Sequence, residues 1–195
     1  MTDVENPPAD APQPSTSDKA ARRRRATIEW VVLIGAALII ALVIKAFLFQ
    51  AFYIPSESMV PTLKVGDRVL VNKLSYDLHD VHRGDIIVFK APPEARRDGI
   101  NDLVKRVIGL PGDTVEARED GRVYVNSRLL DEPYLPKGTR TSNLPPTKVP
   151  AGHYFMMGDN RSASSDSRVW GPIEKSAIIG RVFVRIWPPG SIGLM

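Results

Sequence analysis

A long apolar run near the N-terminus constrains this chain more than any other feature. It reads WVVLIGAALIIALVI from Trp30 to Ile44, and after Lys45 it continues as AFLFQAFYI. As a helix, the stretch from Trp30 to Phe49 would span about 30 Å, which is the thickness of a bilayer core. Lys45 lies close to one end of this stretch, where its amine could extend to the lipid headgroups. The run therefore predicts a transmembrane helix.

Two other structures would also produce an apolar run. A cleaved signal peptide has a shorter apolar region, of about 7–15 residues, and ends in small residues. Here the run is longer and ends in bulky residues, among them Phe47, Phe52 and Tyr53. A buried helix of a globular core would normally carry a polar stripe, and this run has none. We therefore predict a membrane anchor over residues 27–51.

Four consecutive arginines, Arg22–Arg25, precede the run. A basic quartet could bind nucleic acid, but its position beside a membrane span offers a simpler explanation. By the positive-inside rule it places the N-terminus in the cytoplasm and the rest of the chain outside. Residues 1 to about 20 are rich in Pro, Ala, Ser, Thr and Asp and contain no aromatic residue, so they cannot bury enough apolar surface to fold. We expect residues 1–26 to form a disordered cytoplasmic tail that ends in basic residues.

The remaining residues, 52–195, should form one domain outside the membrane. Its apolar segments are short, rich in β-branched residues and bounded by Gly, Pro, Asn or Asp. We expect an exposed loop over Leu135–Pro150, a hairpin turn at Asn126-Ser127 and a helical turn within Glu174–Ile179. The predicted class is mainly β, with antiparallel sheets or a partly closed barrel. The predicted strands are Asp67–Val71, Asp85–Phe89, Leu103–Ile108, Thr114–Ala117, Arg122–Val125, Tyr154–Met157 and Arg181–Ile186.

Several kinds of chemistry are excluded by missing residues. Cysteine is absent, which excludes disulfides, thiolate zinc sites and cysteine nucleophiles. No His-Glu-x-x-His, phosphate-binding loop or dinucleotide glycine pattern occurs, so we expect neither a metal nor a cofactor. The histidines, His79, His82 and His153, could serve a Ser–His–Asp triad, although no Gly-x-Ser-x-Gly element supports one.

Two serines two residues apart lie just after the apolar run. On an extended segment Ser56 and Ser58 would point to the same face, with Glu57 turned away. Pro55 and Pro61 restrict the backbone on both sides. The segment is therefore a candidate for holding a nucleophile. A turn close to the membrane, where Ser and Pro are common, is equally compatible with these residues alone.

A base for such a serine could come from a lysine in an apolar strand. Lys105 lies in LVKRVI, and because neighbours in a strand alternate faces, either Lys105 or Arg106 should point inward. Burial disfavours the ammonium and lowers the pKa of a lysine. To act as a base near neutrality, Lys105 would need a pKa about 3 units below its usual value, which corresponds to about 4 kcal/mol. The alternative is a strand lysine whose amine reaches solvent.

A third polar cluster, Met157–Arg168, follows an apolar strand and reads MGDNRSASSDSR. It combines hydroxyls, carboxylates and two arginines in one loop. It could be a polar surface loop, or it could orient catalytic groups through hydrogen bonds and ion pairs.

Together these stretches resemble the type I signal peptidase family, membrane-bound serine proteases with a Ser–Lys dyad. The resemblance runs in the family's order through FYIPSESMVPTLKVGDRVLVNK, RGDIIVFK, LVKRVIGLPGDTV and YFMMGDNRSASSDSRVWGPI, and it follows an N-terminal anchor. It leaves out only the loops at about 91–101 and 118–150. It implies Ser58 as nucleophile, Lys105 as general base, Ser56 with the Ser58 amide as the oxyanion hole, Ser164 as the hydroxyl that bonds the lysine amine, and Asp166 with Arg168 as a supporting ion pair.

The family removes signal peptides from secretory preproteins after small-x-small (Ala-x-Ala-like) sequences. The resemblance therefore implies preproteins and membrane lipid as partners, without nucleic acid or metal. It also implies a single-pass protein of the bacterial cytoplasmic membrane, with the substrate bound as an added extended strand. The shallow apolar pockets that the resemblance implies would be lined by Phe52, Ile54, Leu63, Leu103 and Val104.

Two rival functions remain to be weighed. A self-cleaving Ser–Lys protease of the LexA repressor type would carry a DNA-binding domain and no anchor, and the apolar run argues against it. A membrane-tethered binding domain that keeps the fold without the activity should have lost Ser58 or Lys105, and both are present.

Overall fold

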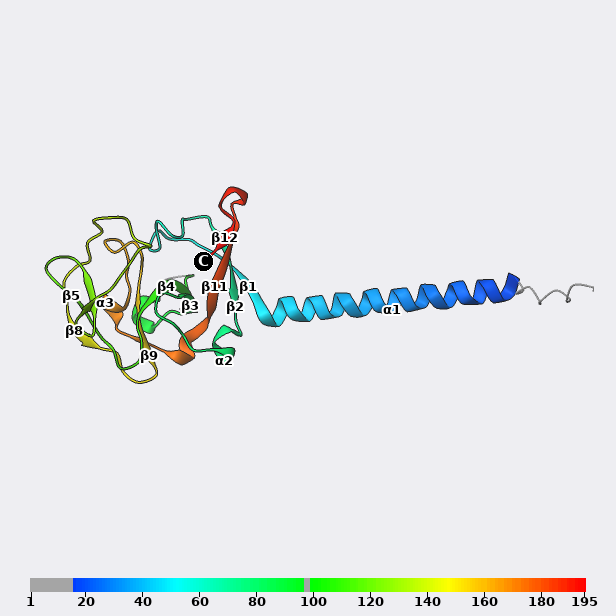
Figure 1. The fold of residues 1–195 in the computed structure, drawn as a ribbon, viewed down its shortest axis with the longest axis horizontal. Coiled ribbons are helices and arrows are strands. Elements are labelled where there is room, and N and C mark those ends of the chain that lie inside the picture. The colour runs from blue at the N-terminus through cyan, green and yellow to red at the C-terminus, as the bar shows by residue number, and fades with distance from the viewer. Residues whose placement is uncertain (1–15, 97–98) are drawn as a thin grey trace, which may run out of the picture. The chain divides into compact units, whose positions relative to one another are not determined.

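The computed structural model describes residues 16–96 and 99–195, without the side chains of residues 16–22 and 44–47 in its first helix. The chain divides into two compact units, residues 1–44 and 45–195. The first unit holds most of helix α1, Thr16–Leu48, and the second holds the strands (Figure 1). Each unit is considered by itself.

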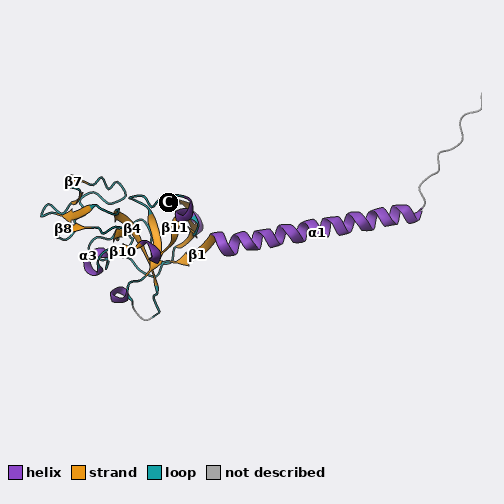
Figure 2. Cartoon of the chain, turned by 90° about the horizontal axis from the view of Figure 1, so that it is seen from below, coloured by secondary structure: helices purple, strands orange, loops and turns teal. Residues whose placement is uncertain are grey.

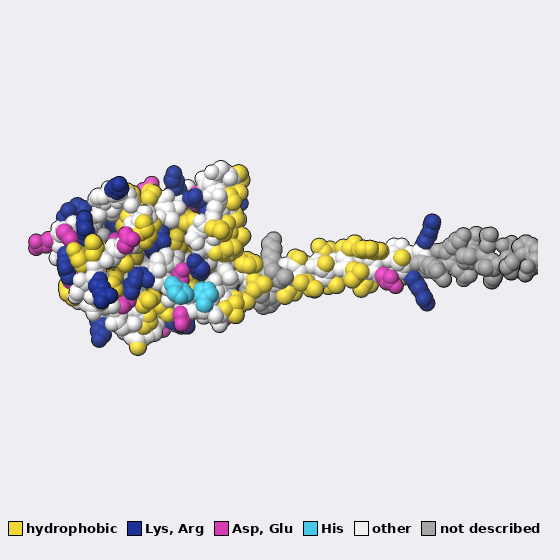
Figure 3. Space-filling view, viewed as in Figure 1, with side chains coloured by type: hydrophobic (Ala, Val, Ile, Leu, Met, Phe, Trp, Pro, Cys, Tyr) yellow, Lys and Arg dark blue, Asp and Glu magenta, His cyan; other side chains and the backbone are white. Residues whose placement is uncertain are grey.

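Helix α1 contains the apolar run. Its segment Arg23–Val43 has a mean hydropathy of 2.4, and among the described residues α1 is the helix long and apolar enough to cross a membrane. Apolar side chains cover it beyond a charged N-terminal end (Figure 3). A single N-terminal apolar helix of this kind fits a single-pass membrane anchor.

The bounds of this helix differ from the predicted 27–51. Thr16–Leu48 begins inside the predicted tail, because the segment DKAARRRRA consists mostly of strong helix formers. Residues 1–15 of that tail lie outside the described residues. At the other end the helix stops at Leu48 and strand β1, Phe49–Tyr53, begins, since FQAFY is rich in aromatic residues that favour strands.

The second unit is mainly β, with antiparallel pairing between its strands, as the sequence predicted (Figure 2). The larger sheet has the order β1-β2-β11-β3-β4-β9-β10, with β12 paired to β11, and the smaller has the order β7-β6-β5-β8. The strands after β1 are β2 Arg68–Asn72, β3 Ile86–Lys90, β4 Asp102–Gly109, β5 Thr114–Ala117, β6 Val123–Val125, β7 Arg128–Leu129, β8 Leu144–Lys148, β9 His153–Met157, β10 Ile173–Glu174, β11 Ile178–Trp187 and β12 Gly193–Leu194.

Short helices connect some of the strands. They are α2 Ser75–Leu78, η1 Pro93–Ala95, α3 Ser167–Trp170, η2 Lys175–Ala177 and η3 Pro189–Ser191. The η2 helix falls within the predicted helical turn at Glu174–Ile179, and the predicted turn at Asn126-Ser127 joins β6 to β7. Both turn residues have positive φ, 52° and 63°, as a tight hairpin requires.

One segment contradicts the prediction. Leu135–Pro150 was expected to be an exposed loop, yet Leu144–Lys148 forms β8 and pairs with β5. Two prolines lie in this strand, and they are tolerated because β8 is at the edge of the smaller sheet, where ladder donors can be missing.

Side chains pack against both faces of the larger sheet, and the packing on one face holds the loop that contains the candidate site. Along β3 the side chains alternate between two core clusters: Ile86 and Val88 pack in one, while Ile87 and Phe89 pack in the other. The first cluster also takes in apolar residues of the loop between β1 and β2. That loop is thus held against the sheet by buried apolar surface, and it contains both candidate serines.

Candidate active site

Ser58 lies in a turn and Ser56 in the bend just before it, and not in the extended segment that the sequence predicted. The Val60 amide donates to the Glu57 carbonyl at 3.0 Å, which closes the turn. Even so, the two hydroxyls come together, with Ser56 Oγ and Ser58 Oγ 3.3 Å apart. A turn brings two side chains of one short segment together as effectively as a strand pleat does.

This loop is fixed at both ends and in its middle. At its start the Ile54 amide donates to the Asp67 carbonyl at 2.9 Å, and Ile54, Met59 and Leu63 are buried in the core. In its middle the Asn160 amide donates to the Ser58 carbonyl at 3.1 Å. The nucleophile candidate therefore sits on a backbone that is held from two separate parts of the fold.

Lys105 reaches Ser58 from strand β4. Its Nζ donates to Ser58 Oγ at 2.6 Å and to the Val104 carbonyl at 3.1 Å. In β4 it lies opposite Ile87 of β3, so its aliphatic stem is packed among strand residues. When the amine is neutral, the same contact lets Lys105 accept the serine proton.

Burial makes that neutral form accessible. Lys105 is only 3% exposed. Desolvation lowers the pKa of Lys105 from its ordinary 10.5 to about 8, with Arg168 lowering it further while Asp166 and Asp159 oppose the shift. A useful fraction of the amine is therefore neutral at mildly alkaline pH.

Two hydrogen-bond donors, the Ser56 hydroxyl and the Ser58 amide, lie beside the Ser58 hydroxyl. No described residue accepts a hydrogen bond from the Ser58 amide, so this donor is available. The exposed Ser56 hydroxyl is the second available donor close to Ser58 Oγ. Two donors converging beside a nucleophile are the arrangement that stabilises a tetrahedral intermediate.

The loop after β9 packs against the Ser58–Lys105 pair. Asp166 and Arg168 form an ion pair at 2.8 Å, and the Gly158 amide donates to Asp166 Oδ2 at 3.0 Å. Although burial opposes it, hydrogen bonding from Arg168 holds the pKa of the Asp166 carboxyl below its usual range. Ser164 Oγ is buried but forms no hydrogen bond to Lys105 Nζ, so the bond to the lysine amine implied by the resemblance is not formed here.

Gly158 is required by this packing. A Cβ at that position would lie 2.2 Å from Ser164 Oγ and 2.4 Å from the Ser58 carbonyl oxygen. Both distances are far below contact distance, and one of the two atoms belongs to the backbone of the nucleophile segment. The close approach of the two loops therefore depends on the absence of a side chain.

A second buried pair, formed by the residue next to Lys105 in β4, was not predicted from the sequence. Either Lys105 or Arg106 was expected to face inward, but both are buried, because Arg106 is paired with Asp159 at 2.6 Å. Asp159 also accepts from the Thr62 hydroxyl at 2.5 Å, which ties β4 to the serine loop. The Gly-Asp-Asn-Arg run marked this loop as polar, but nothing in the sequence identified its partners.

A further buried contact anchors the same loop from a distant segment. Arg161 bonds the carboxylate of Glu132 and donates to Thr141 Oγ1 at 3.0 Å, and the ring of Tyr134 lies 3.8 Å from the Arg106 guanidinium carbon. Thr141, which belongs to the predicted exposed loop Leu135–Pro150, is buried in this contact, so the anchoring was not predicted.

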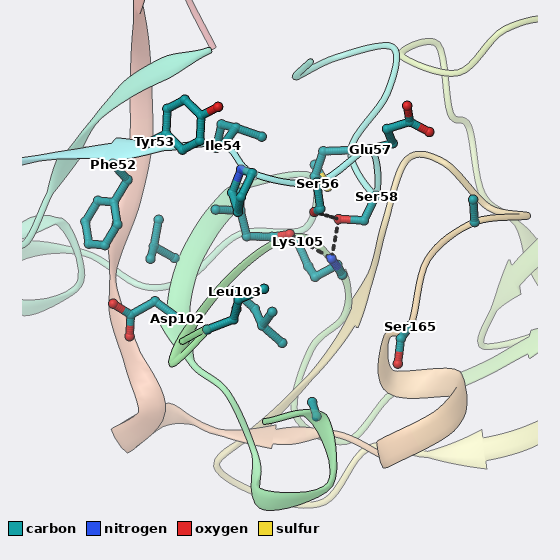
Figure 4. A pocket seen from close by; sticks show the side chains of 17 residues that line it. Phe52, Tyr53, Ile54, Ser56, Glu57, Ser58, Asp102, Leu103, Lys105 and Ser165 are labelled. Atoms are coloured by element: carbon teal, nitrogen blue, oxygen red, sulfur yellow. Dashed lines mark hydrogen bonds between the residues drawn. The ribbon is translucent and has the colours of Figure 1, made fainter. Parts of the chain in front are cut away.

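The hydroxyl–amine pair opens into a cavity of about 250 Å³ (Figure 4). Four of the five predicted pocket residues line it: Phe52, Ile54, Leu103 and Val104. Leu63 does not, because it is fully buried against the core. The view shows Phe52, Asp102 and Leu103 to one side of Ser58 and Lys105, and Glu57 and Ser165 to the other.

The histidines take no part in this cavity. His79 and His153 bond backbone carbonyls close by in sequence, and none of the three histidines lines the cavity. Among the described residues no three His, Asp or Glu side chains are grouped so as to hold a metal ion. The side chain that could take the proton from Ser58 Oγ is therefore the Lys105 amine, which is in contact with it.

Comparison with known proteins agrees with this arrangement. The family model described as signal peptidase, peptidase S26, matches residues 27–187. The chain belongs to the signal peptidase family. A probable signal peptidase I-2 of Synechocystis is 43% identical, over 82% of this chain and 72% of the relative.

A signal peptidase I of Leptolyngbya laminosa is also 43% identical, over 95% of this chain and 94% of its own length. A crystal structure of a signal peptidase I from Enterococcus faecalis has 33% identity and a TM-score of 0.45, covering 53% of this chain and 97% of the other. As a member of the signal peptidase I family, the chain is a hydrolase and a serine peptidase, and the substrates of signal peptidase I are the signal peptides of secretory preproteins.

Proposed function

We propose that this signal peptidase cleaves by a Ser–Lys dyad, with Ser58 as nucleophile and Lys105 as general base. The observation that carries the proposal is the 2.6 Å contact between Lys105 Nζ and Ser58 Oγ at the edge of a substrate-sized cavity. The lowered pKa of Lys105, about 8, supports it, because a general base works best when its pKa is near the working pH.

The reaction proceeds in two steps. Neutral Lys105 takes the Ser58 proton as Oγ attacks the carbonyl carbon of the scissile peptide bond, and the resulting oxyanion accepts hydrogen bonds from the Ser56 hydroxyl and the Ser58 amide. The intermediate collapses, the C–N bond breaks, and protonated Lys105 gives its proton to the departing amine. Water, deprotonated by Lys105, then attacks the acyl-enzyme and releases the signal peptide with Ser58 restored.

The polar loop serves the lysine indirectly. Asp166 and Arg168 bring opposite charges close to Lys105, so Asp166 raises the pKa of the amine and Arg168 lowers it. In this proposal the buried hydroxyl of Ser164, which forms no hydrogen bond to Lys105 here, turns toward the amine when substrate is bound. That movement would give the amine a hydroxyl partner while Ser58 is acylated.

In this proposal the enzyme cleaves after small-x-small sequences. The apolar wall formed by the side chains of Phe52, Ile54, Leu103 and Val104 would receive the small residues before the scissile bond. An extended substrate would lie along β4 and the residues that follow β1. Backbone hydrogen bonds would supply affinity and the pockets would supply specificity.

We further propose that α1 anchors the enzyme in the bacterial cytoplasmic membrane, with the tail that contains Arg22–Arg25 in the cytoplasm and residues 52–195 outside. The length and hydropathy of Arg23–Val43 and the preceding arginines support this orientation. The apolar segment of a signal peptide occupies the same bilayer, which raises the effective concentration of substrate at the enzyme. Protease protection of tagged termini in sealed vesicles tests the orientation.

The activity is tested with the detergent-solubilised full chain and a preprotein that carries an Ala-x-Ala site. We expect one cut, located by N-terminal sequencing of the product directly after the second alanine. Replacing that alanine with leucine should abolish the cut, and the Ser58→Ala protein should not cleave. Cleavage by Ser58→Ala at the wild-type rate, or equal cleavage of the leucine substrate, would contradict the proposal.

A further inference from the structure

Two carboxylates line the proposed substrate cavity, one at each end of it. Asp102 begins strand β4, and Glu57 lies between the two serines. Figure 4 shows Asp102 beyond Leu103 on one side of the Ser58–Lys105 pair and Glu57 on the opposite side. Neither is needed for the proposed chemistry, yet both lie at the border of the cavity that would receive a bound peptide.

The apolar wall indicates which end receives which part of the substrate. Phe52, Ile54 and Leu103 lie on the same side as Asp102, and the small residues that precede the scissile bond require this apolar surface. The residues that follow the bond should therefore leave on the other side, past Glu57 and Ser165. Glu57 lies beside the departing segment.

The backbone of Glu57 is fixed although its side chain is exposed. Its carbonyl accepts hydrogen bonds from the Val60 amide at 3.0 Å and from Asn160 Nδ2 at 3.2 Å. Its Cα is about 3.8 Å from that of Ser58. No described residue forms an ion pair with its carboxylate. The Glu57 carboxylate therefore stays within reach of the first residues after the bond.

We propose that Glu57 is a specificity-determining residue that favours substrates with a basic residue just after the cleavage site and disfavours acidic ones. This inference rests on the proposed function and names a class of substrate for the same site. The Glu57 carboxylate attracts a lysine and repels a glutamate, and both effects raise the ratio of kcat/KM for the lysine substrate to that for the glutamate substrate. This ratio is therefore the product of two modest surface interactions.

The test uses three peptides with one signal segment and one Ala-x-Ala site, differing only in Lys, Gln or Glu at the second residue after the bond. For the wild-type full chain in detergent at low salt, we expect kcat/KM for the lysine peptide to exceed that for the glutamate peptide about fivefold to tenfold. In Glu57→Gln this ratio should fall to about one or two. In the wild type it should shrink in 0.5 M NaCl, because exposed charges are screened.

The control is Asp102→Asn, which removes the same charge from the opposite end of the same cavity and should keep the wild-type ratio. A Glu57→Gln protein that keeps the wild-type ratio would overturn the inference, as would an Asp102→Asn protein that loses it. If the wild type cleaves none of the three peptides, the proposed function itself fails. If it cleaves all three equally, only the inference about Glu57 fails.

Discussion

Lys105 Nζ lies 2.6 Å from Ser58 Oγ although 47 residues separate them in the chain. The lysine is fixed in strand β4, whereas the serine is in the loop between β1 and β2, and the shared sheet and its core bring the two together. Burial of the amine and proximity of the hydroxyl therefore have one structural cause. Removing the loop from the sheet would expose the lysine and return its pKa toward the ordinary value.

The pH dependence of activity should report this burial. Because the base must be neutral, kcat/KM should rise with pH and level off above about 8, the pKa of Lys105. Below that value it should fall about tenfold for each pH unit. Steady-state cleavage of a peptide substrate between pH 6 and 10 measures the profile. A rate that stays constant down to pH 6 would exclude Lys105 as the base.

Stability should depend on pH in the same range. At pH 7 the lysine is charged and buried, which is unfavourable, and its lowered pKa corresponds to a penalty of about 3 kcal/mol. Between about pH 8 and 10.5 the unfolded chain keeps the proton while the folded protein loses it, so stability rises with pH. Lys105→Met should therefore be inactive yet more stable than the wild type at pH 7, with the difference narrowing by pH 10.5. Denaturant unfolding of both proteins checks this, and a Lys105→Met protein less stable at every pH would contradict it.

The two charges of the polar loop should shift the activity profile in opposite directions. Arg168 lowers the pKa of Lys105 and Asp166 raises it. Arg168→Gln should move the rising limb of kcat/KM to higher pH, and Asp166→Asn, which can still cap helix α3, should move it lower. Circular dichroism confirms that each variant is folded. Shifts of the same sign in both variants would show that the loop acts through structure and not through charge.

Ser56 should matter for the rate and not for substrate binding. If its hydroxyl donates to the oxyanion, Ser56→Ala should lower kcat about 100-fold to 1,000-fold with little change in KM, because the hydrogen bond forms only in the transition state. Ser56→Thr keeps the hydroxyl and is the matched control, for which partial activity is expected. A large rise in KM with kcat unchanged would assign Ser56 to ground-state binding instead.

Much of the fold could be predicted because each strand carries its own local signal. The seven predicted strands each overlap an observed one, and the turn at Asn126-Ser127 follows from residue types that tolerate positive φ. Strand β8 could not be predicted, because its two prolines normally indicate a loop and only its edge position makes them acceptable. Strand β1 was hidden for another reason, since its residues continue the apolar run of α1.

Some features of the site likewise depend on neighbouring residues and could be predicted, whereas others depend on contacts between distant segments. The proximity of the two serine hydroxyls could be predicted from their spacing, although the turn that joins them could not. The burial of Arg106 next to the buried Lys105 depends on Asp159, which is distant in sequence. Leu63 was placed in the pocket by its position near the serines, yet its side chain packs into the core. Long-range contacts of this kind leave no pattern in a single sequence.

The most direct test of the dyad compares wild type, Ser58→Ala and Lys105→Met in the cleavage of one preprotein at pH 9. At this pH most of the wild-type lysine should be neutral, given its pKa of about 8. Enzyme in excess over substrate isolates the first turnover, and circular dichroism verifies that each variant is folded. We predict that both variants form less than about a thousandth of the wild-type product in that turnover. A folded Lys105→Met protein that cleaves at a rate near that of the wild type would contradict the assignment of Lys105 as the base.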